Sequence, residues 1–283
     1  MNNKRITIPI ILGRKNSEHK ITALTAYDYS FARILDSTGI DIVLVGDSLG
    51  MVSLGYENTL PVTMDEIIAH TRAVKRGLHN PLLVGDMPFM SYHVSDEQAI
   101  TNAGRIIQEG GAEAVKLEGG VRMAGRVAAI VQAGIPVMGH VGLTPQSVHQ
   151  FGGYKVQGKN QFDARQILQD ALALEKAGVF SIVLEGIPED LGQKITRELK
   201  IPSIGIGAGP GCDGQILVLH DLLGLNSDFS PKFVKRYVDL KTQIESAVQQ
   251  YVQEVRSGEF PGEEHSYKSQ REPLKRVENY HQK

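Results

Sequence analysis

Four apolar, strand-like runs of this chain each end in a carboxylate, at Asp47, Asp86, Glu118 and Glu185. A carboxylate prefers water, so its place at the tip of a buried strand is costly unless a cation, a proton or a reaction requires it there. The carboxyl ends of parallel strands lie at one edge of a sheet, where ligands commonly bind. The pattern therefore predicts an acidic site at that edge.

Asp47 and Asp86 share one context, in which two apolar residues, a valine and a glycine precede the aspartate. Oxygen ligands of this kind suit a hard cation such as Mg2+, which takes one or two carboxylates and keeps water for a substrate to displace. The alternative is that each aspartate only caps the helix or turn that follows it. A single such aspartate favours the cap, whereas two in matched contexts favour the metal.

Lys116 and Glu118 are two residues apart on one expected strand, so their side chains point to the same face. If that face is the interior of a barrel, the lysine can neutralise a carboxylate substrate or a developing enolate. Glu118 can then complete the shell of the metal. The alternative is a buried ion pair with a structural role only.

The fourth acid, Glu185, and two further residues lie at or just after expected strand ends. Glu185 has no basic residue near it in the sequence, and in an apolar mouth its raised proton affinity would make it a base near neutral pH; it can also be a helix-terminus or surface acid. His140 is expected to be a satisfied core histidine, with an orienting role as the second interpretation. Ser48 follows Asp47 and can donate to a substrate carboxylate or simply begin a helix.

The elements that must position these residues alternate between short apolar runs and longer amphipathic ones, which is typical of repeated βα units around a parallel sheet. The expected strands are 21–28, 40–47, 81–88, 114–120, 136–142, 181–188, 202–209 and 215–219. Eight strands predict an α/β protein with a (β/α)8 TIM barrel, whose working face is the carboxyl end of the strands. The alternative is an open doubly wound sheet, but its usual glycine-rich first turn is missing after the first strand.

Beyond the barrel, a helical pattern extends from about Ser230 to Gly258, and a polar, charged end follows a break that contains glycine and proline. We expect a single catalytic barrel domain at 1–262 and a C-terminal polar extension at 263–283. The extension is either a surface or assembly arm or a disordered tail.

Composition narrows the class of partner. The 283 residues are 41% hydrophobic, enough for a large core, and the formal net charge of -2 gives no electrostatic reason to expect nucleic acid or an anionic membrane. A small-molecule ligand is therefore expected. The lone Cys212 excludes an intramolecular disulfide and the first residues lack the apolar core of a signal peptide, so we expect a cytoplasmic protein.

A glycine-rich segment, 205–214, follows the seventh expected strand. In barrels this position commonly holds a phosphate through backbone amides. The segment contains no lysine or arginine, and close packing or a subunit contact would require glycine equally. Both interpretations stay open.

Longer blocks of this sequence resemble the ketopantoate hydroxymethyltransferase family. The blocks that carry the likeness are 45–51, 59–63, 139–147, 152–158 and 204–209. The likeness extends from about Thr22 to His265, and blocks this long, in this order, make a chance similarity improbable.

The resemblance implies a (β/α)8 barrel of the phosphoenolpyruvate/pyruvate type that assembles as a homodecamer and uses Mg2+. It implies transfer of the one-carbon unit of 5,10-methylenetetrahydrofolate to 3-methyl-2-oxobutanoate, which gives 2-dehydropantoate for pantothenate and coenzyme A biosynthesis. The implied roles are metal binding for Asp47, Asp86 and Glu118, contact with the keto acid for Asp47, Ser48, Asp86 and Lys116, and proton acceptance for Glu185.

Two other functions are compatible with parts of the sequence. A lyase or mutase of the phosphoenolpyruvate type shares the barrel, Mg2+ and an enolate, but such lyases typically carry a reactive cysteine in a mobile loop, and the only thiol here is Cys212. A catalytically silent scaffold or binding subunit would be expected to have lost the acids, which are intact.

Overall fold

The structure is a computed structural model that describes residues 5–225 and 231–269. They belong to two compact units that divide between Val238 and Asp239. In the first unit, eight parallel strands close into a barrel in chain order, and β8 pairs with β1. The strands are β1 (Ile21–Thr25), β2 (Ile42–Val45), β3 (Leu82–Asp86), β4 (Ala114–Glu118), β5 (Val137–Gly142), β6 (Ser181–Glu185), β7 (Ser203–Ile206) and β8 (Gly214–Leu217). The expected (β/α)8 barrel is confirmed.

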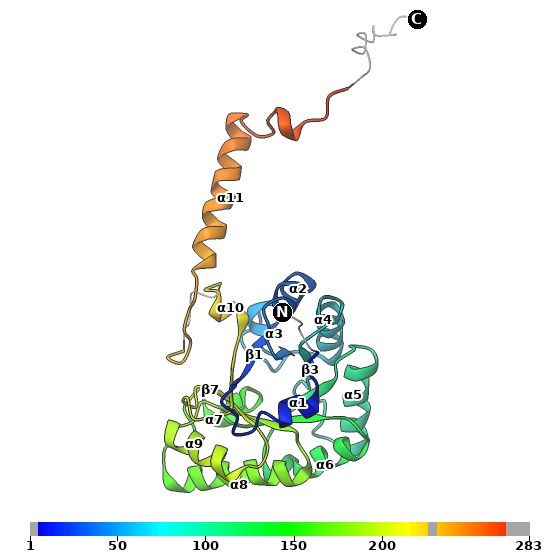
Figure 1. Ribbon diagram of the computed structural model, residues 1–283, viewed down its shortest axis with the longest axis vertical. Helices are drawn as coiled ribbons and strands as arrows, with labels where there is room; N and C mark the ends of the chain where they lie inside the picture. Colours follow the sequence, from blue (N-terminus) through cyan, green and yellow to red (C-terminus); the bar gives the residue numbers. More distant parts are fainter. Residues whose placement is uncertain (1–4, 226–230, 270–283) are drawn as a thin grey trace, which may run out of the picture. The chain divides into compact units, whose positions relative to one another are not determined.

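Helices surround the strands in sequence order, as Figure 1 shows for α2, α4, α5, α6, α8 and α9. The helices of the first unit are α1 (Ile8–Leu12), α2 (Tyr29–Asp36), α3 (Leu49–Val52), α4 (Met64–Gly77), α5 (Asp96–Gln108), η1 (Val121–Met123), α6 (Ala124–Gln132), η2 (Pro145–Ser147), α7 (Val148–Phe151), α8 (Gln161–Ala177), α9 (Glu189–Glu198) and α10 (Leu219–Leu222). Side-chain caps begin several of them. Thr63 and Glu66 form the capping box of α4, and Ser95 accepts a hydrogen bond from the Gln98 amide at the start of α5.

Alternation along the strands decides which side chains enter the barrel. In β4, Val115 and Leu117 pack into the hydrophobic cluster shared with the surrounding helices, whereas Ala114 belongs to the cluster inside the barrel. Side chains of a strand alternate between its faces, so Lys116 and Glu118 follow Ala114 into the interior. One base and one acid of the mouth, Lys116 and Glu118, therefore lie on the inner face of β4.

The amino end of the barrel is closed by α1. Ile11 of this helix is fully buried and belongs to the same inner cluster as Ile21, Ile42 and Leu82. Proline at the start of α1 fits a first helical turn, where a backbone donor is not needed. Ligands of the barrel interior are thereby restricted to its opposite, carboxyl end.

The glycine-rich segment after β7 returns the chain to β8 without a helix. A Cβ atom at Gly209 would lie 2.5 Å from Cγ of Glu189, and one at Gly211 would lie 3.0 Å from Cβ of Gln193. Both neighbours belong to α9, and the α9 residue Gly192 in turn allows Ala208 to approach. Close packing against α9 therefore explains these glycines, which was the alternative to a phosphate cradle.

The second unit contains α11 (Leu240–Ser257) and η3 (Glu263–His265). The sequence pattern placed the start of this helix near Ser230, but residues 231–239 are not helical. The side chain of Asp239 accepts a hydrogen bond from the Thr242 amide and so fixes the first turn. Most of the expected extension, 270–283, lies outside the described residues, and the boundary between 262 and 263 stays a prediction. Across the described ranges, no helix is both long and apolar enough to span a bilayer.

Candidate active site

The register between β3 and β4 places Asp86 beside Lys116. Nζ of Lys116 lies 2.8 Å from both carboxylate oxygens of Asp86, and both side chains are almost completely buried. The sequence suggested Glu118 as the partner in a buried ion pair, but the structure pairs Lys116 with Asp86 on the adjacent strand. The pair lies at the carboxyl end of the strands, where a substrate that enters the barrel mouth can contact it.

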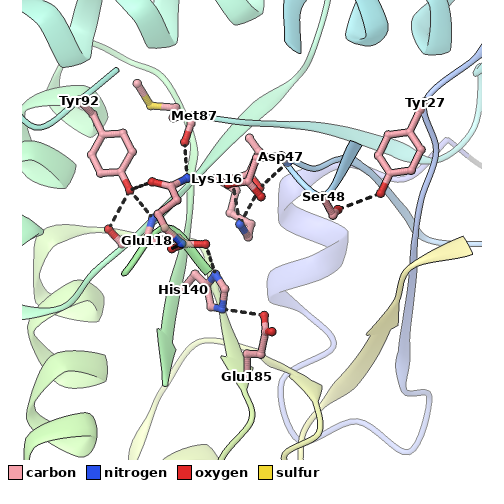
Figure 2. Close-up of polar contacts among 11 residues, drawn as sticks. Tyr27, Asp47, Ser48, Met87, Tyr92, Lys116, Glu118, His140 and Glu185 are labelled. Atoms are coloured by element: carbon pink, nitrogen blue, oxygen red, sulfur yellow. Dashed lines mark hydrogen bonds and ion pairs between the residues drawn. The ribbon is translucent and has the colours of Figure 1, made fainter. Parts of the chain in front are cut away.

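The register between β4 and β5 places Glu118 beside His140. Nδ1 of His140 lies 3.4 Å from Oε1 of Glu118, and Nε2 lies 3.1 Å from Oε2 of Glu185 on β6 (Figure 2). The histidine therefore connects two of the four acids. An orienting role, the second interpretation from the sequence, agrees with these contacts better than a histidine that serves the core alone.

Asp47 lies just beyond β2 and joins the same cluster. Its amide donates to Oδ2 of Asp86 over 3.3 Å, and its own Oδ2 accepts a hydrogen bond of 2.9 Å from Nε2 of Gln146. Asp47 does not cap the short helix α3, because the N-cap position belongs to Ser48. The Ser48 hydroxyl lies 2.8 Å from the Tyr27 hydroxyl (Figure 2). Among the described residues, this is the only hydrogen bond that the Ser48 side chain makes.

Negative charge dominates the electrostatics of the mouth. The pKa of Asp47 is raised well above its ordinary value, first by burial and then by the charges of Asp86 and Glu118. Burial alone would lower the pKa of Lys116, but Asp86, Glu118 and Asp47 together raise it. Lys116 is therefore charged, and its single charge does not balance the carboxylates around it.

His140 supplies a second positive charge. Burial and the charge of Lys116 lower its pKa, but its contacts with Glu118 and Glu185 outweigh them and raise the pKa to about 9. The imidazole is therefore cationic at neutral pH. Sequence neighbours had suggested that no base lies near Glu185; the tertiary structure brings one to it from the adjacent strand.

Two buried residues of the site were not identified from the sequence. Gln146, in η2 after β5, bonds both Asp47 and Glu118, and Tyr92, in the loop after β3, donates a hydrogen bond of 2.7 Å to Oε1 of Gln146. Gln146 lies inside one of the blocks that carried the family resemblance, which was a signal for it. Nothing local marked Tyr92.

The residues of the mouth fit a divalent cation in charge and in donor chemistry. Four acids face two cationic side chains, and Oε1 of Glu118 is buried without a hydrogen bond. The candidate ligand atoms are all carboxylate oxygens, the type of ligand that Mg2+ prefers. Among the described residues, no three His, Cys, Asp or Glu side chains are yet arranged as a metal shell, and Lys116 holds both oxygens of Asp86.

The fold is shared with enzymes of the phosphoenolpyruvate mutase/isocitrate lyase superfamily. Phosphonopyruvate hydrolase in complex with oxalate and Mg2+ matches with a TM-score of 0.60 at 13% identity, over 92% of this chain and 93% of that chain. A 2,3-dimethylmalate lyase of the superfamily matches with a TM-score of 0.58 at 16% identity, over 91% and 87%. At this identity the likeness concerns the fold. Fold and site together define a (β/α)8-barrel enzyme with an acidic mouth.

Sequence comparison gives the particular family. The model of the ketopantoate hydroxymethyltransferase family matches residues 5–263. A 3-methyl-2-oxobutanoate hydroxymethyltransferase of Pelobacter propionicus is 61% identical over 93% of this chain and 98% of that protein. One of Clostridium beijerinckii is 58% identical over 93% and 96%. The chain belongs to the ketopantoate hydroxymethyltransferase family.

Proposed function

We propose that this protein transfers a hydroxymethyl group to 3-methyl-2-oxobutanoate, giving 2-dehydropantoate for pantothenate biosynthesis. The donor in this proposal is 5,10-methylenetetrahydrofolate, and the metal is Mg2+. Family membership supports the reaction. The observation that carries the mechanism is the excess of buried acids over bases at the mouth of the barrel, where only a cation or a reacting group makes such an excess favourable.

In this proposal Asp47, Asp86 and Glu118 hold the Mg2+. A cation held there would supply Lewis-acid stabilisation of the negative charge that develops on the keto oxygen of the substrate. Oε1 of Glu118, buried and without a hydrogen bond, supports the assignment. The raised pKa of Asp47 supports it as well, since repulsion between neighbouring carboxylates is what a divalent cation relieves.

Lys116 and Ser48 are assigned to the keto acid, together with Asp47 and Asp86. The Lys116 ammonium is buried and charged, and it offers a fixed positive group to a substrate carboxylate. The Ser48 hydroxyl shares a hydrogen bond with Tyr27 and is only half-buried, so it can turn toward a ligand.

Glu185 is the proposed base. Its carboxylate would accept the C3 proton of the keto acid, and C3 would then form a bond to the one-carbon unit of the donor. The net reaction takes up water and releases tetrahydrofolate. Glu185 is the most exposed of the four acids, with 16% of its side chain accessible. Its Oε2 lies 3.1 Å from Nε2 of the cationic His140, which fixes its orientation. A base needs this combination of access and fixed orientation.

Proton exchange tests the proposal without the folate donor. Purified protein with Mg2+ should exchange the C3 proton of 3-methyl-2-oxobutanoate for deuterium, as followed by NMR in D2O, and a chelator should stop the exchange. Added 5,10-methylenetetrahydrofolate should then give 2-dehydropantoate. Absence of both exchange and product would refute the proposal.

A lyase reaction through a cysteine receives no support from the structure. Cys212 is fully buried, and burial raises the pKa of its thiol. A nucleophilic or acidic thiol in a barrel mouth would need access and a lowered pKa.

We also propose that the protein assembles with copies of itself, with ten subunits as the family expectation. Helix α11 has no buried residue, and Ile244, Val248, Tyr251 and Val255 recur along it at helical spacing while 45% to 56% exposed. Such an apolar stripe typically packs against another chain. Native mass spectrometry would give the subunit number, and a monomer at micromolar concentration would contradict assembly.

A further inference from the structure

Gln146 is bonded to residues at or just beyond the carboxyl ends of three different strands. Its Nε2 lies 2.9 Å from Oδ2 of Asp47 and 3.0 Å from the carbonyl oxygen of Met87. Its backbone amide donates to Oε2 of Glu118 over 3.0 Å, and its Oε1 accepts from the Tyr92 hydroxyl over 2.7 Å. Figure 2 labels the residues that Gln146 contacts: Asp47, Met87, Tyr92 and Glu118. The residue is only 6% exposed, so solvent has little access to replace these partners.

The chemistry of the partners fixes the orientation of the amide. The Met87 carbonyl can only accept, so the atom that faces it must be the NH2 group of Gln146. The Tyr92 hydroxyl has one proton and two acceptors near it, Oε1 of Gln146 at 2.7 Å and the Glu118 carbonyl oxygen at 3.3 Å, and the much shorter contact assigns the proton to Gln146. A reversed amide would place oxygen against oxygen at Met87. The amide of Gln146 is therefore fixed in one orientation by its hydrogen-bond partners.

The same bonds divide the oxygens of the two carboxylates. Gln146 occupies Oδ2 of Asp47 with its side chain and Oε2 of Glu118 with its backbone. Within the described residues, Oδ1 of Asp47 makes no hydrogen bond, and Oε1 of Glu118 is buried without one, although His140 lies 3.4 Å away. In each acid one oxygen is thus bonded to Gln146, while the other makes no hydrogen bond to a described residue, and in Glu118 that other oxygen faces the His140 imidazole.

We infer that Gln146 is a positioning residue of the proposed Mg2+ site, which holds Asp47 and Glu118 in place through one oxygen of each carboxylate. This inference rests on the proposed function, because it assumes that these acids bind the metal. Groups that hydrogen-bond a metal ligand fix its orientation, and their loss typically weakens metal affinity by about 10-fold to 100-fold. A side chain that served packing alone would instead affect stability and leave metal affinity unchanged.

Calorimetric titration of Mg2+ into the full-length protein distinguishes these roles. Gln146→Met keeps the length and approximate volume of the side chain and keeps the backbone bond to Glu118, but removes the bonds to Asp47, Met87 and Tyr92. We expect its Mg2+ affinity to be about 10-fold to 100-fold weaker than that of the unmodified protein. The matched control is Thr196→Val, which removes buried hydroxyl bonds to the Gly192 carbonyl and Ser203 at the other end of the barrel.

The control should lower the melting temperature and leave Mg2+ affinity unchanged. Gln146→Met with the affinity of the unmodified protein would overturn the inference, and so would equal losses of affinity in both variants. If Gln146→Met does not fold, Gln146→Asn carries the same criteria, since its shorter amide cannot reach Asp47 and Tyr92 together. Failure of the unmodified protein to bind Mg2+ would instead refute the proposed metal site, and this inference with it.

Discussion

The two ends of the barrel both bury acids, but only one end leaves them unbalanced. At the amino end, Asp41 lies just before β2 and Asp213 just before β8, and both are almost completely buried. At the carboxyl end lie Asp47, Asp86, Glu118 and Glu185. A buried carboxylate is therefore not by itself the sign of an active site in this molecule, and the difference lies in what each carboxylate contacts.

At the amino end each acid has its own base and backbone donors. Arg14 lies 2.8 Å from Asp41, which also accepts from the amide and hydroxyl of Thr22 at 2.9 Å. Lys15 lies 2.9 Å from Asp213, which also accepts from the amide of Ser203. Both bases follow α1 directly, so these pairs fasten the segment that closes the barrel. Their role is structural and their charge is neutralised.

At the carboxyl end the four acids share Lys116 and the cationic His140. The low-dielectric interior strengthens the repulsion among these carboxylates, which costs stability. It equally strengthens their attraction for a cation or a substrate, which is why the imbalance suits a functional site. Excess charge, rather than burial, marks the functional end. Three substitutions and one change of pH separate the two ends.

The largest expected effect is the loss of chemistry at Glu185. Glu185→Gln keeps the shape of the side chain and can still contact His140, but it cannot accept a proton. We expect deuterium exchange at C3 of the keto acid to fall by about 100-fold to 10,000-fold. Binding of the keto acid, measured by calorimetry with Mg2+, should change little. Loss of exchange and binding together would assign Glu185 to binding, not to proton transfer.

The next effect concerns stability at the opposite end. Asp213→Asn would leave the largely buried Lys15 ammonium without its counterion, and we expect a loss of about 3 kcal/mol in the free energy of unfolding, measured with urea. The protein that remains folded should keep its exchange rate.

Asp47→Asn is the matched substitution at the mouth. Because Asp86 and Glu118 repel the Asp47 carboxylate, this variant should lose exchange without loss of stability in metal-free buffer. Equal destabilisation by both variants would remove the distinction between the two ends.

The smallest effect is a pH dependence that belongs to the mouth. The pKa of His140 is about 9 in the folded protein, compared with 6.5 for a histidine of the unfolded chain. Protonation of His140 therefore stabilises the folded state fully below pH 6.5, and this stabilisation is lost as the pH rises through 9. At 1.36 kcal/mol per unit the loss is about 3 kcal/mol. Metal-free protein should unfold at lower urea concentration at pH 9.5 than at pH 6.5.

His140→Gln is the control for this titration, because it removes the group whose proton is lost. Its urea midpoint should vary less between the two pH values than that of the unmodified protein. The same dependence in both proteins would show that another group titrates.

Much of the fold and part of the site could be predicted from the sequence. The alternation of apolar runs and helical patterns predicted the eight strands, because a buried parallel strand reads as a short continuous apolar run. The acids at the ends of those runs followed from the same pattern. The start of α11 was misplaced by about ten residues, since apolar spacing continues across 231–239 while the capping bond of Asp239 decides where the helix begins.

Contacts between strands could not be predicted in the same way. No sequence signal places His140 beside both Glu118 and Glu185, or Tyr92 beside Gln146, because each pair depends on register and on loops that return over the mouth. The glycines after β7 were equally ambiguous until the approach of α9 showed what fills the space beside them.

The sequence by itself determined the barrel, the family and the four strand-end acids, because these depend on local order along the chain. Only the tertiary structure decided which acids are balanced and which are not. That balance depends on distances between side chains of different strands, and electrostatic energy in a buried site changes steeply over the few ångströms that a one-residue shift of register would alter.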